Sequence, residues 1–279
     1  MKKVFAILLS SALVLSLAAC GAKTDSDTSA SEPEVSTSTE VSTEASVDEP
    51  VASTETSTEA SVDEPAPEEN DEAAVISYAD YAAAELGTDV VVEFTVQATQ
   101  SWWNDQITVY GADEDGAYFV YNMACSQDDA AKLVPGAVIK VTGTKTAWAG
   151  EVEIGANDMG DAPSFEFVDK AGYIAPAKDA TALLGTDEIA DLNNQLVSFS
   201  DMTVTAVSYK NNEPGDDIYV NLSKDDVEYY FCLEYYLNGS DEEFYNLVGN
   251  LEVGTVVDVE AYLYWYEGIN PHITKVTVK

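Results

Sequence analysis

The chain changes composition abruptly near Ile76, and this break determines which part of it can fold. Residues 21–75 consist mainly of Ser, Thr, Glu, Ala and Pro and contain no aromatic side chain. Such a segment cannot bury enough apolar surface to offset the entropy lost on ordering. A nine-residue unit, Ser42–Pro50, recurs as Ser57–Pro65, which is typical of a spacer. We therefore predict a disordered stalk over residues 20–75, with the folded part beginning at residue 76.

The region from residue 76 to residue 279 contains one order of elements twice. Each copy has a long alternating strand, two short strands, a helix start and two final strands. In the first copy the strands are expected near 90–98, 107–110, 118–124, 138–144 and 152–154, with the helix beginning at Ser126. In the second copy they are expected at 196–209, 218–222, 227–235, 256–266 and 273–278, with the helix beginning near Ser240. This repetition predicts two domains, residues 76–175 and residues 176–279, joined by a linking segment.

Five strands with a helix between the third and the fourth is the order of an OB-fold, a small closed barrel. Both copies resemble OB-fold modules of exported bacterial proteins, including those attached to surface nucleases. The resemblance rests on the short helix ahead of the long first strand and on Pro135-Gly136 before strand four, matched by Val253-Gly254 in the second copy. Ala261 replaces Gly143, so the curvature of that strand is expected to differ. The predicted fold class is mainly β with short helices, as two tandem five-stranded OB-like barrels.

The first twenty residues resemble the export signal of bacterial lipoproteins. Lys2 and Lys3 precede an apolar run, and Leu17-Ala18-Ala19-Cys20 resembles the lipobox, whose cysteine is diacylated before cleavage. Two acyl chains anchor a protein stably, whereas one holds it only marginally. The resemblance implies a signal peptide at residues 1–19, a fatty-acylated Cys20 (a palmitate anchor) and a position on the extracytoplasmic side of the cell membrane. The alternative is an ordinary secretory signal in which Cys20 is incidental.

The charge of the chain is strongly negative, with 51 acidic residues against 12 basic ones and a net charge of -39. All the basic residues are lysine. Because affinity for nucleic acid comes largely from Lys and Arg at phosphates, this balance predicts that nucleic acid is disfavoured as a partner. Lys140 and Lys145 share one expected strand, so the sequence still allows a local row of basic side chains there.

Several smaller patterns point away from metal, cofactor or catalytic chemistry. Cys125 and Cys232 are expected to be buried thiols rather than a disulfide, and their spacing fits no metal site. The acidic turns at 113–115 and 216–217 could hold calcium but are better explained as solvated turns. His272, the only histidine, is expected to be a surface or packed residue. Since no nucleophile elbow, phosphate loop or arginine is present, we expect no enzyme, no cofactor and no metal.

Aromatic side chains in polar turns mark the candidate binding residues. OB-folds usually bind ligands across strands two and three, between the loops that join strands one to two and four to five. The aromatic residues expected near those loops are Trp102, Trp103, Trp148, Tyr209, Tyr264 and Tyr266. They could form a stacking platform for a ligand, or they could cover the barrel ends and pack between the domains. Trp102 and Trp103 cannot both point inward, because neighbours in a strand face opposite sides.

These patterns together predict a lipid-anchored binding or scaffold protein on a disordered acidic stalk. The ligand expected at the aromatic loops is a carbohydrate or a protein, because stacking of sugars needs no positive charge. Binding of nucleic acid or nucleotides through the OB-folds is the alternative. A third possibility is a structural spacer, for which all the aromatic rings would be buried.

Overall fold

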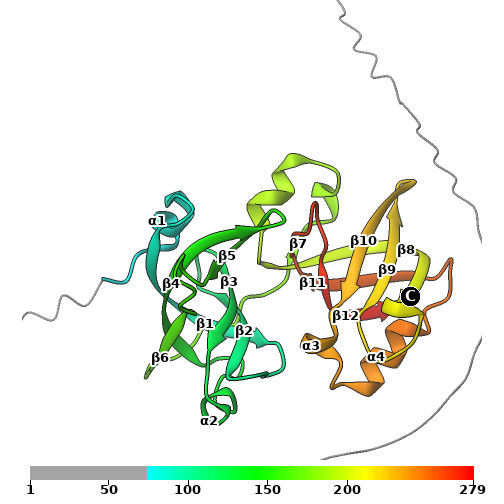
Figure 1. Ribbon diagram of the computed structural model, residues 1–279. Coiled ribbons are helices and arrows are strands. Elements are labelled where there is room, and N and C mark those ends of the chain that lie inside the picture. The colour runs from blue at the N-terminus through cyan, green and yellow to red at the C-terminus, as the bar shows by residue number, and fades with distance from the viewer. Residues whose placement is uncertain (1–73) are drawn as a thin grey trace, which may run out of the picture. The chain divides into compact units, whose positions relative to one another are not determined.

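The structure, a computed structural model, describes residues 74–279, which form two six-stranded β-sheets (Figure 1). Each sheet closes on itself to make a barrel, and both barrels belong to one compact unit. The predicted fold class, two tandem OB-like barrels, is confirmed. The predicted signal peptide, lipobox and stalk lie outside the described residues, apart from the last two positions of the stalk.

The first barrel follows the OB order of strands. Its elements are α1 (Tyr78–Ala83), β1 (Asp89–Thr99), β2 (Gln106–Ala112), β3 (Ala117–Ala124), α2 (Gln127–Ala130), β4 (Val138–Trp148) and β5 (Glu151–Gly155). The strands pair in the order β1-β2-β3-β5-β4, and β4 pairs again with β1 to close the barrel. The β3–β5 pair is parallel, whereas the other pairs are antiparallel. This closure leaves none of these five strands with a free edge.

Alternation along β1 explains why this barrel has a core. Val90, Val92, Phe94 and Val96 point inward and are almost fully buried. The Phe94 ring stacks on the Tyr118 ring of β3, with 5.0 Å between the ring centroids. Burying such side chains contributes about 1.5–3 kcal/mol each, which is the main source of stability for a small barrel.

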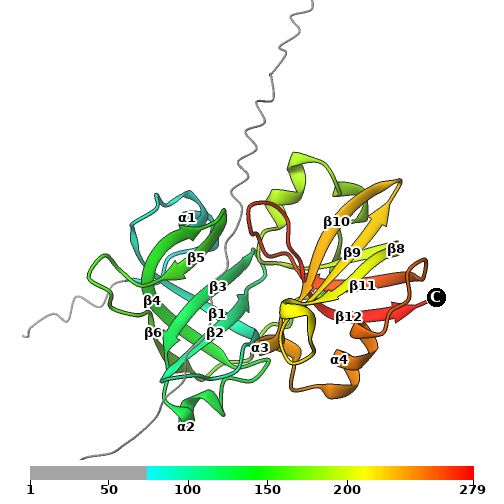
Figure 2. The same cartoon turned by 45° about the vertical axis from the view of Figure 1, so that its right-hand side comes forward.

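The second barrel repeats the arrangement (Figure 2). It consists of β8 (Leu196–Tyr209), β9 (Ile218–Lys224), β10 (Val227–Leu233), α3 (Tyr235–Asn238), α4 (Glu242–Gly249), β11 (Val256–Tyr262) and β12 (His272–Val278). The order is β11-β12-β10-β9-β8, with β11 pairing back to β8 and with a parallel β10–β12 pair. Its long first strand has the bounds that the sequence predicts, whereas α3 was not predicted.

Turn chemistry at matched positions supports the internal repeat. Gly136 and Gly254 both have positive φ, at 97° and 89°, so both copies enter strand four through the same left-handed residue. Gly143 and Ala261 hold matching positions in the two copies. A Cβ on Gly143 would lie 2.6 Å from Ile154 Cγ2. Ala261, by contrast, is next to a register shift in the β11–β12 pairing. The irregular pairing gives the second barrel room for the methyl group.

The linking segment is more ordered than the sequence suggests. β6 (Ser164–Val168) adds to β4, and β7 (Lys178–Asp179) adds to β8 in parallel. Short 3-10 turns follow at Thr181–Leu183 and Asp187–Leu192, before β8, and a third at Lys210–Asn212 lies between β8 and β9. The expectation of a plain linker is corrected here, because Phe165 and Phe167 alternate with polar residues as a strand requires.

Among residues 74–279, no helix is long and apolar enough to cross a bilayer.

Candidate ligand-binding site

The two barrels meet through aromatic side chains. Tyr110 on β2 stacks on Tyr262 at the end of β11, with 4.5 Å between ring centroids. Phe119 on β3 makes an edge contact with Tyr264 at 5.3 Å. Because these side chains are largely buried, part of the face formed by β2 and β3 serves as a joint between the barrels. This part of the face is therefore covered and is not open to a ligand.

His272 is buried and belongs to this joint. Its Nδ1 lies 2.7 Å from the Tyr110 hydroxyl, and its ring stacks on Tyr264 at 4.3 Å. Burial lowers the pKa of His272 to about 3, so the imidazole is neutral at physiological pH. A neutral imidazole has one protonated and one unprotonated nitrogen, so the tautomer of His272 decides which partner donates in this hydrogen bond. The prediction of a packed histidine agrees with this geometry.

An open groove of 870 Å³ lies beside the joint and is bordered by both barrels. Six of the described aromatic side chains line it while remaining 40% to 59% exposed, namely Tyr121, Trp148, Tyr219, Tyr230, Tyr236 and Tyr266. The volume is within the range of ligand pockets, about 300–1,000 Å³. Exposed rings gathered in one concave surface are unusual in a monomer, and such surfaces often bind ligands. We call this surface the aromatic groove.

The charged side chains that line the aromatic groove are one lysine, Lys210, and three acids, Asp217, Glu234 and Glu267. Lys210 Nζ lies 3.1 Å from an Asp216 carboxylate oxygen and 3.0 Å from one of Asp217, and these acids raise the pKa of Lys210. Burial, and then the charge of Asp217, raises the pKa of Glu234 to about 7. The lysine is already engaged by carboxylates, and Glu234 is partly protonated near neutral pH. Ring stacking is therefore the main interaction that the groove offers.

Three of the six predicted binding residues come together in the aromatic groove. Trp148 and Tyr266 face each other from the two barrels, with 5.2 Å between their rings, and Tyr264 lines the floor. The β4–β5 turn that carries Trp148 approaches the second barrel closely, because Gly150 lies against the Trp265 ring where a Cβ would be only 2.5 Å away. The binding role of these residues stays a prediction.

The other three predicted residues lie elsewhere. Trp102 packs against the first core and donates a hydrogen bond of 2.8 Å from Nε1 to Cys125 O. Tyr209 packs in the second barrel beside Tyr245. Trp103 is 76% exposed and lines a hollow that adjoins the groove. Only one ring of the tryptophan pair therefore faces solvent.

Sequence reasoning missed four rings of the aromatic groove. Tyr121, Tyr219 and Tyr230 occupy strand positions and Tyr236 lies in α3. Tyr219 and Tyr230 belong to strands two and three of the second barrel, the face that OB-folds use for ligands. Their outward positions in the alternation were a usable signal, because a large ring on the solvent side of a strand has no packing role there.

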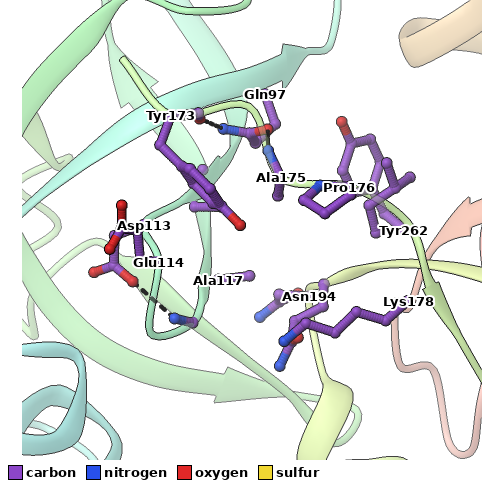
Figure 3. Close-up of a pocket in the computed structure, with 15 residues that line it drawn as sticks. Gln97, Asp113, Glu114, Ala117, Tyr173, Ala175, Pro176, Lys178, Asn194 and Tyr262 are labelled. Carbon is purple, nitrogen blue, oxygen red and sulfur yellow. Dashed lines mark hydrogen bonds between the residues drawn. The ribbon is translucent and has the colours of Figure 1, made fainter. Parts of the chain in front are cut away.

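A second, much smaller cavity of 20 Å³ lies near the Asp113–Gly116 turn (Figure 3). Its wall includes Tyr173, whose carbonyl accepts a hydrogen bond of 2.8 Å from Gln97 Nε2. Asn194 lines it too, and its Oδ1 has no hydrogen-bond donor among residues 74–279. A space of this size holds about one water molecule. The cavity is therefore too small for a larger ligand.

The acidic turn at this cavity is held by hydrogen bonds to the Asp113 carboxylate. Asp113 Oδ1 accepts hydrogen bonds from the backbone N–H groups of Asp115 and Gly116, at 2.9 and 2.7 Å. Its Oδ2 accepts one from the Tyr118 hydroxyl. Across residues 74–279, no cluster of three or more His, Cys, Asp or Glu side chains is arranged to hold a metal. Cys125 and Cys232 are buried, unpaired thiols.

Comparison with known proteins gives a structural likeness without a family. No known protein family matches the sequence, and no curated protein matches it either. Among solved structures, a p204 HINb domain is 12% identical over 67% of this chain and 95% of its own, with a TM-score of 0.31. A murine DNA-binding protein bound with double-stranded DNA is 11% identical over 68% of this chain and 96% of its own, with a TM-score of 0.35. A replication protein A heterotrimer bound to single-stranded DNA is 10% identical, covering 71% of this chain and 51% of its own, with a TM-score of 0.28.

These likenesses correct one prediction. Two of the three structures contain DNA, which runs against the prediction that nucleic acid is disfavoured as a partner, and that prediction is withdrawn. The physical reason is that net charge averages over a whole surface. Binding of single strands by OB-folds depends instead on local rings on which bases stack. The aromatic groove supplies such rings whatever the total charge.

Proposed function

We propose that this chain is a lipid-anchored, extracytoplasmic binding protein that holds a ring-bearing ligand in the aromatic groove. The observation that carries the proposal is the set of six half-exposed aromatic rings around one groove of 870 Å³. Both barrels contribute to it, so the ligand binds to the pair of barrels as a unit. The rings act as platforms, and the proposal assigns no chemical step to the groove.

Carbohydrate or a protein segment is the first candidate ligand. The face of a sugar ring can lie flat on Trp148 or a tyrosine, and it requires no cation. Lys210, the one lysine in the lining, is already paired with Asp216 and Asp217. A neutral ligand can therefore enter without breaking an existing ion pair.

Single-stranded nucleic acid is the second candidate, and the position of the rings favours it. Tyr219 and Tyr230 stand on the strands where OB-folds bind oligonucleotides. Stacking of a base on an aromatic ring contributes about 1–3 kcal/mol and tolerates any sequence. The DNA-bound structures with a similar fold hold a ligand of this same class, nucleic acid.

The experiment is a binding screen of the full-length protein against neutral glycans and single-stranded oligonucleotides at two salt concentrations. We expect saturable binding by at least one class, lost in the Trp148→Ala, Tyr266→Ala double variant. The matched control is Met159→Ala, an exposed apolar residue that is not part of the groove. Salt-independent binding would assign the ligand to the glycans, and binding lost as salt rises would assign it to nucleic acid. Equal binding by the double variant would refute the proposal.

The lipid anchor is tested separately. Metabolic labelling with a fatty-acid analogue should mark the wild-type protein and not the Cys20→Ala variant. The Cys125→Ala variant serves as the control, since Cys125 is buried and unpaired. Label retained by Cys20→Ala would refute the anchor without affecting the proposal for the groove.

A further inference from the structure

A hollow of 450 Å³ next to the aromatic groove has a lining unlike the rest of this protein. It surrounds Trp103, Tyr121 and Tyr236, and we call it the Trp103 hollow. None of the described residues that line it carries a charge, in a chain with 51 acidic side chains. Its lining consists of aromatic rings, amides, hydroxyls and one isoleucine. Such a surface offers nothing to an ion and many contacts to a neutral polar molecule.

The Trp103 hollow is continuous with the aromatic groove. Gln100, Tyr121 and Tyr236 line both. The contact between the barrels holds the two spaces together, because the Ser101 N–H and hydroxyl donate to Tyr236 O at 2.7 and 3.1 Å. A linear ligand that lies in the groove can therefore continue past Tyr236 into the hollow.

Trp103 is held in place by a tight turn. Its backbone N–H donates to Gln106 O, and Gln106 N–H donates to Trp103 O, both at 3.0 Å. Asn104 and Asp105 between them have positive φ, at 50° and 59°, as a two-residue hairpin turn requires. The ring nevertheless stays 76% exposed. Because the turn already fixes the backbone that carries this ring, binding a ligand there orders only the side chain.

Three amide side chains in the hollow are available for hydrogen bonds. Within residues 74–279, the side chains of Asn104, Gln106 and Asn122 have no hydrogen-bond partner. Each amide can donate and accept, which matches a hydroxyl group that does both. Hydroxyls beside a ring face are the recognition features of a sugar, whereas a phosphate would find no cation here.

We infer that a neutral oligosaccharide is the ligand and that it spans the aromatic groove and the Trp103 hollow, with Trp103 as its far platform. This inference rests on the proposed function and names the class of its ligand. It also assigns different parts of the chain to different units of the ligand. Short oligomers occupy the larger groove, and only longer ones reach Trp103.

The test is titration calorimetry of the full-length protein with β-1,4-linked glucose and N-acetylglucosamine oligomers of increasing length. We expect the affinity to rise roughly tenfold from two units to six, as one added stacking contact would give. Trp103→Ala should lose that gain while it still binds the shortest oligomer like the wild type. Trp103→Phe, which keeps a ring, should recover most of it. Met159→Ala is the control for an equally exposed position outside both spaces.

The outcomes separate the two proposals. A Trp103→Ala variant with the full gain in affinity would overturn the role of the hollow. Binding of oligothymidine and of no neutral oligosaccharide, if lost in the Trp148→Ala, Tyr266→Ala double variant, would overturn the inference and leave the proposed function standing. Binding that is unaffected by any of these variants would overturn both.

Discussion

The backbone N–H of Trp265 in the second barrel donates a hydrogen bond of 2.8 Å to Glu151 Oε2 in the first. Glu151 is fully buried at the start of β5, and burial raises its pKa to about 8. Asn193 Nδ2 also approaches it, at 3.4 Å, and the oxygens Asn193 Oδ1 and Asn194 Oδ1 have no donor within residues 74–279. A protonated Glu151 carboxyl supplies a hydrogen-bond donor near these acceptor oxygens, which otherwise have too few donors.

Stability should therefore fall as pH rises between about 6.5 and 8.5. The Glu151 carboxyl keeps its proton in the folded state at pH values where the unfolded chain has already released it. Raising the pH therefore favours the unfolded state. The loss over this window should be on the order of 2 kcal/mol, since one pKa unit corresponds to about 1.4 kcal/mol. Glu153, whose pKa burial raises to about 7, changes stability in the same direction. His272 opposes this trend only at the lower end of the window, because the unfolded chain still protonates it near pH 6.5, whereas it is neutral in both states well above that pH.

Thermal unfolding of Glu151→Gln across this range is the measurement. The amide keeps the shape and cannot ionise, so the slope of stability against pH should become shallower. Glu114→Gln, in an exposed turn, is the control that removes the same charge and should keep the wild-type slope. An unchanged slope in Glu151→Gln would contradict the assignment.

Removing the Tyr110 hydroxyl should destabilise the joint between the barrels. Tyr110→Phe leaves the buried Nδ1 of His272 without its hydrogen-bond partner, which should cost about 1–3 kcal/mol. Tyr262→Phe is the matched control, because its ring stacks on Tyr110 while its hydroxyl has no partner within residues 74–279. Chemical denaturation measures both variants. Equal stability of the two would show that the hydrogen bond contributes nothing.

Lys145 should stabilise the first barrel although it is a buried cation. Its Nζ donates to the carbonyl oxygens of Tyr81, Ala82 and Ala84, at 2.9, 2.9 and 2.8 Å, and so satisfies the end of α1. Lys145→Met should cost about 1–3 kcal/mol, because it leaves these carbonyls without donors. Lys132→Met, which removes an exposed lysine paired with Asp129, should change stability much less, because solvent screens the exposed pair.

Trp148 and Tyr266 should contribute to binding and little to stability. Both rings are about half exposed, so Trp148→Ala should change the free energy of unfolding by less than about 1 kcal/mol. The same change should weaken ligand binding by about 1–3 kcal/mol, as loss of one stacking platform does. Denaturation and calorimetry on one protein sample measure the two effects. A large loss of stability with unchanged binding would make Trp148 a packing residue.

The fold could be predicted from the sequence because its signals are local. Alternation along 196–209 gave the bounds of β8, and Ser126 is the N-cap of α2, accepting a hydrogen bond from the Asp129 N–H. The α2 helix itself is shorter than expected, since it ends at Ala130 and turns follow before Pro135. The strand β6 was missed, because five residues in a presumed linker give a weak pattern.

The candidate site could be predicted only in part. Trp148, Tyr264 and Tyr266 stood out as rings near turns, and these do line the groove. The sequence could not show that Tyr121 and Tyr230 lie beside these three residues, since nothing in the spacing shows which faces of the two barrels meet. The burial of Glu151 is likewise a tertiary effect, because an acid after Gly150 in a turn looks like a solvated residue.

Oxidative footprinting of the full-length protein tests the aromatic groove as the binding surface most directly. Hydroxyl radicals oxidise exposed rings, and mass spectrometry reports each position with and without the ligand found in the binding screen. We predict that Trp148, Tyr230 and Tyr266 are protected together at saturating ligand, while exposed Met159 is oxidised equally in both samples. Unchanged oxidation of all three rings at saturation would contradict the account.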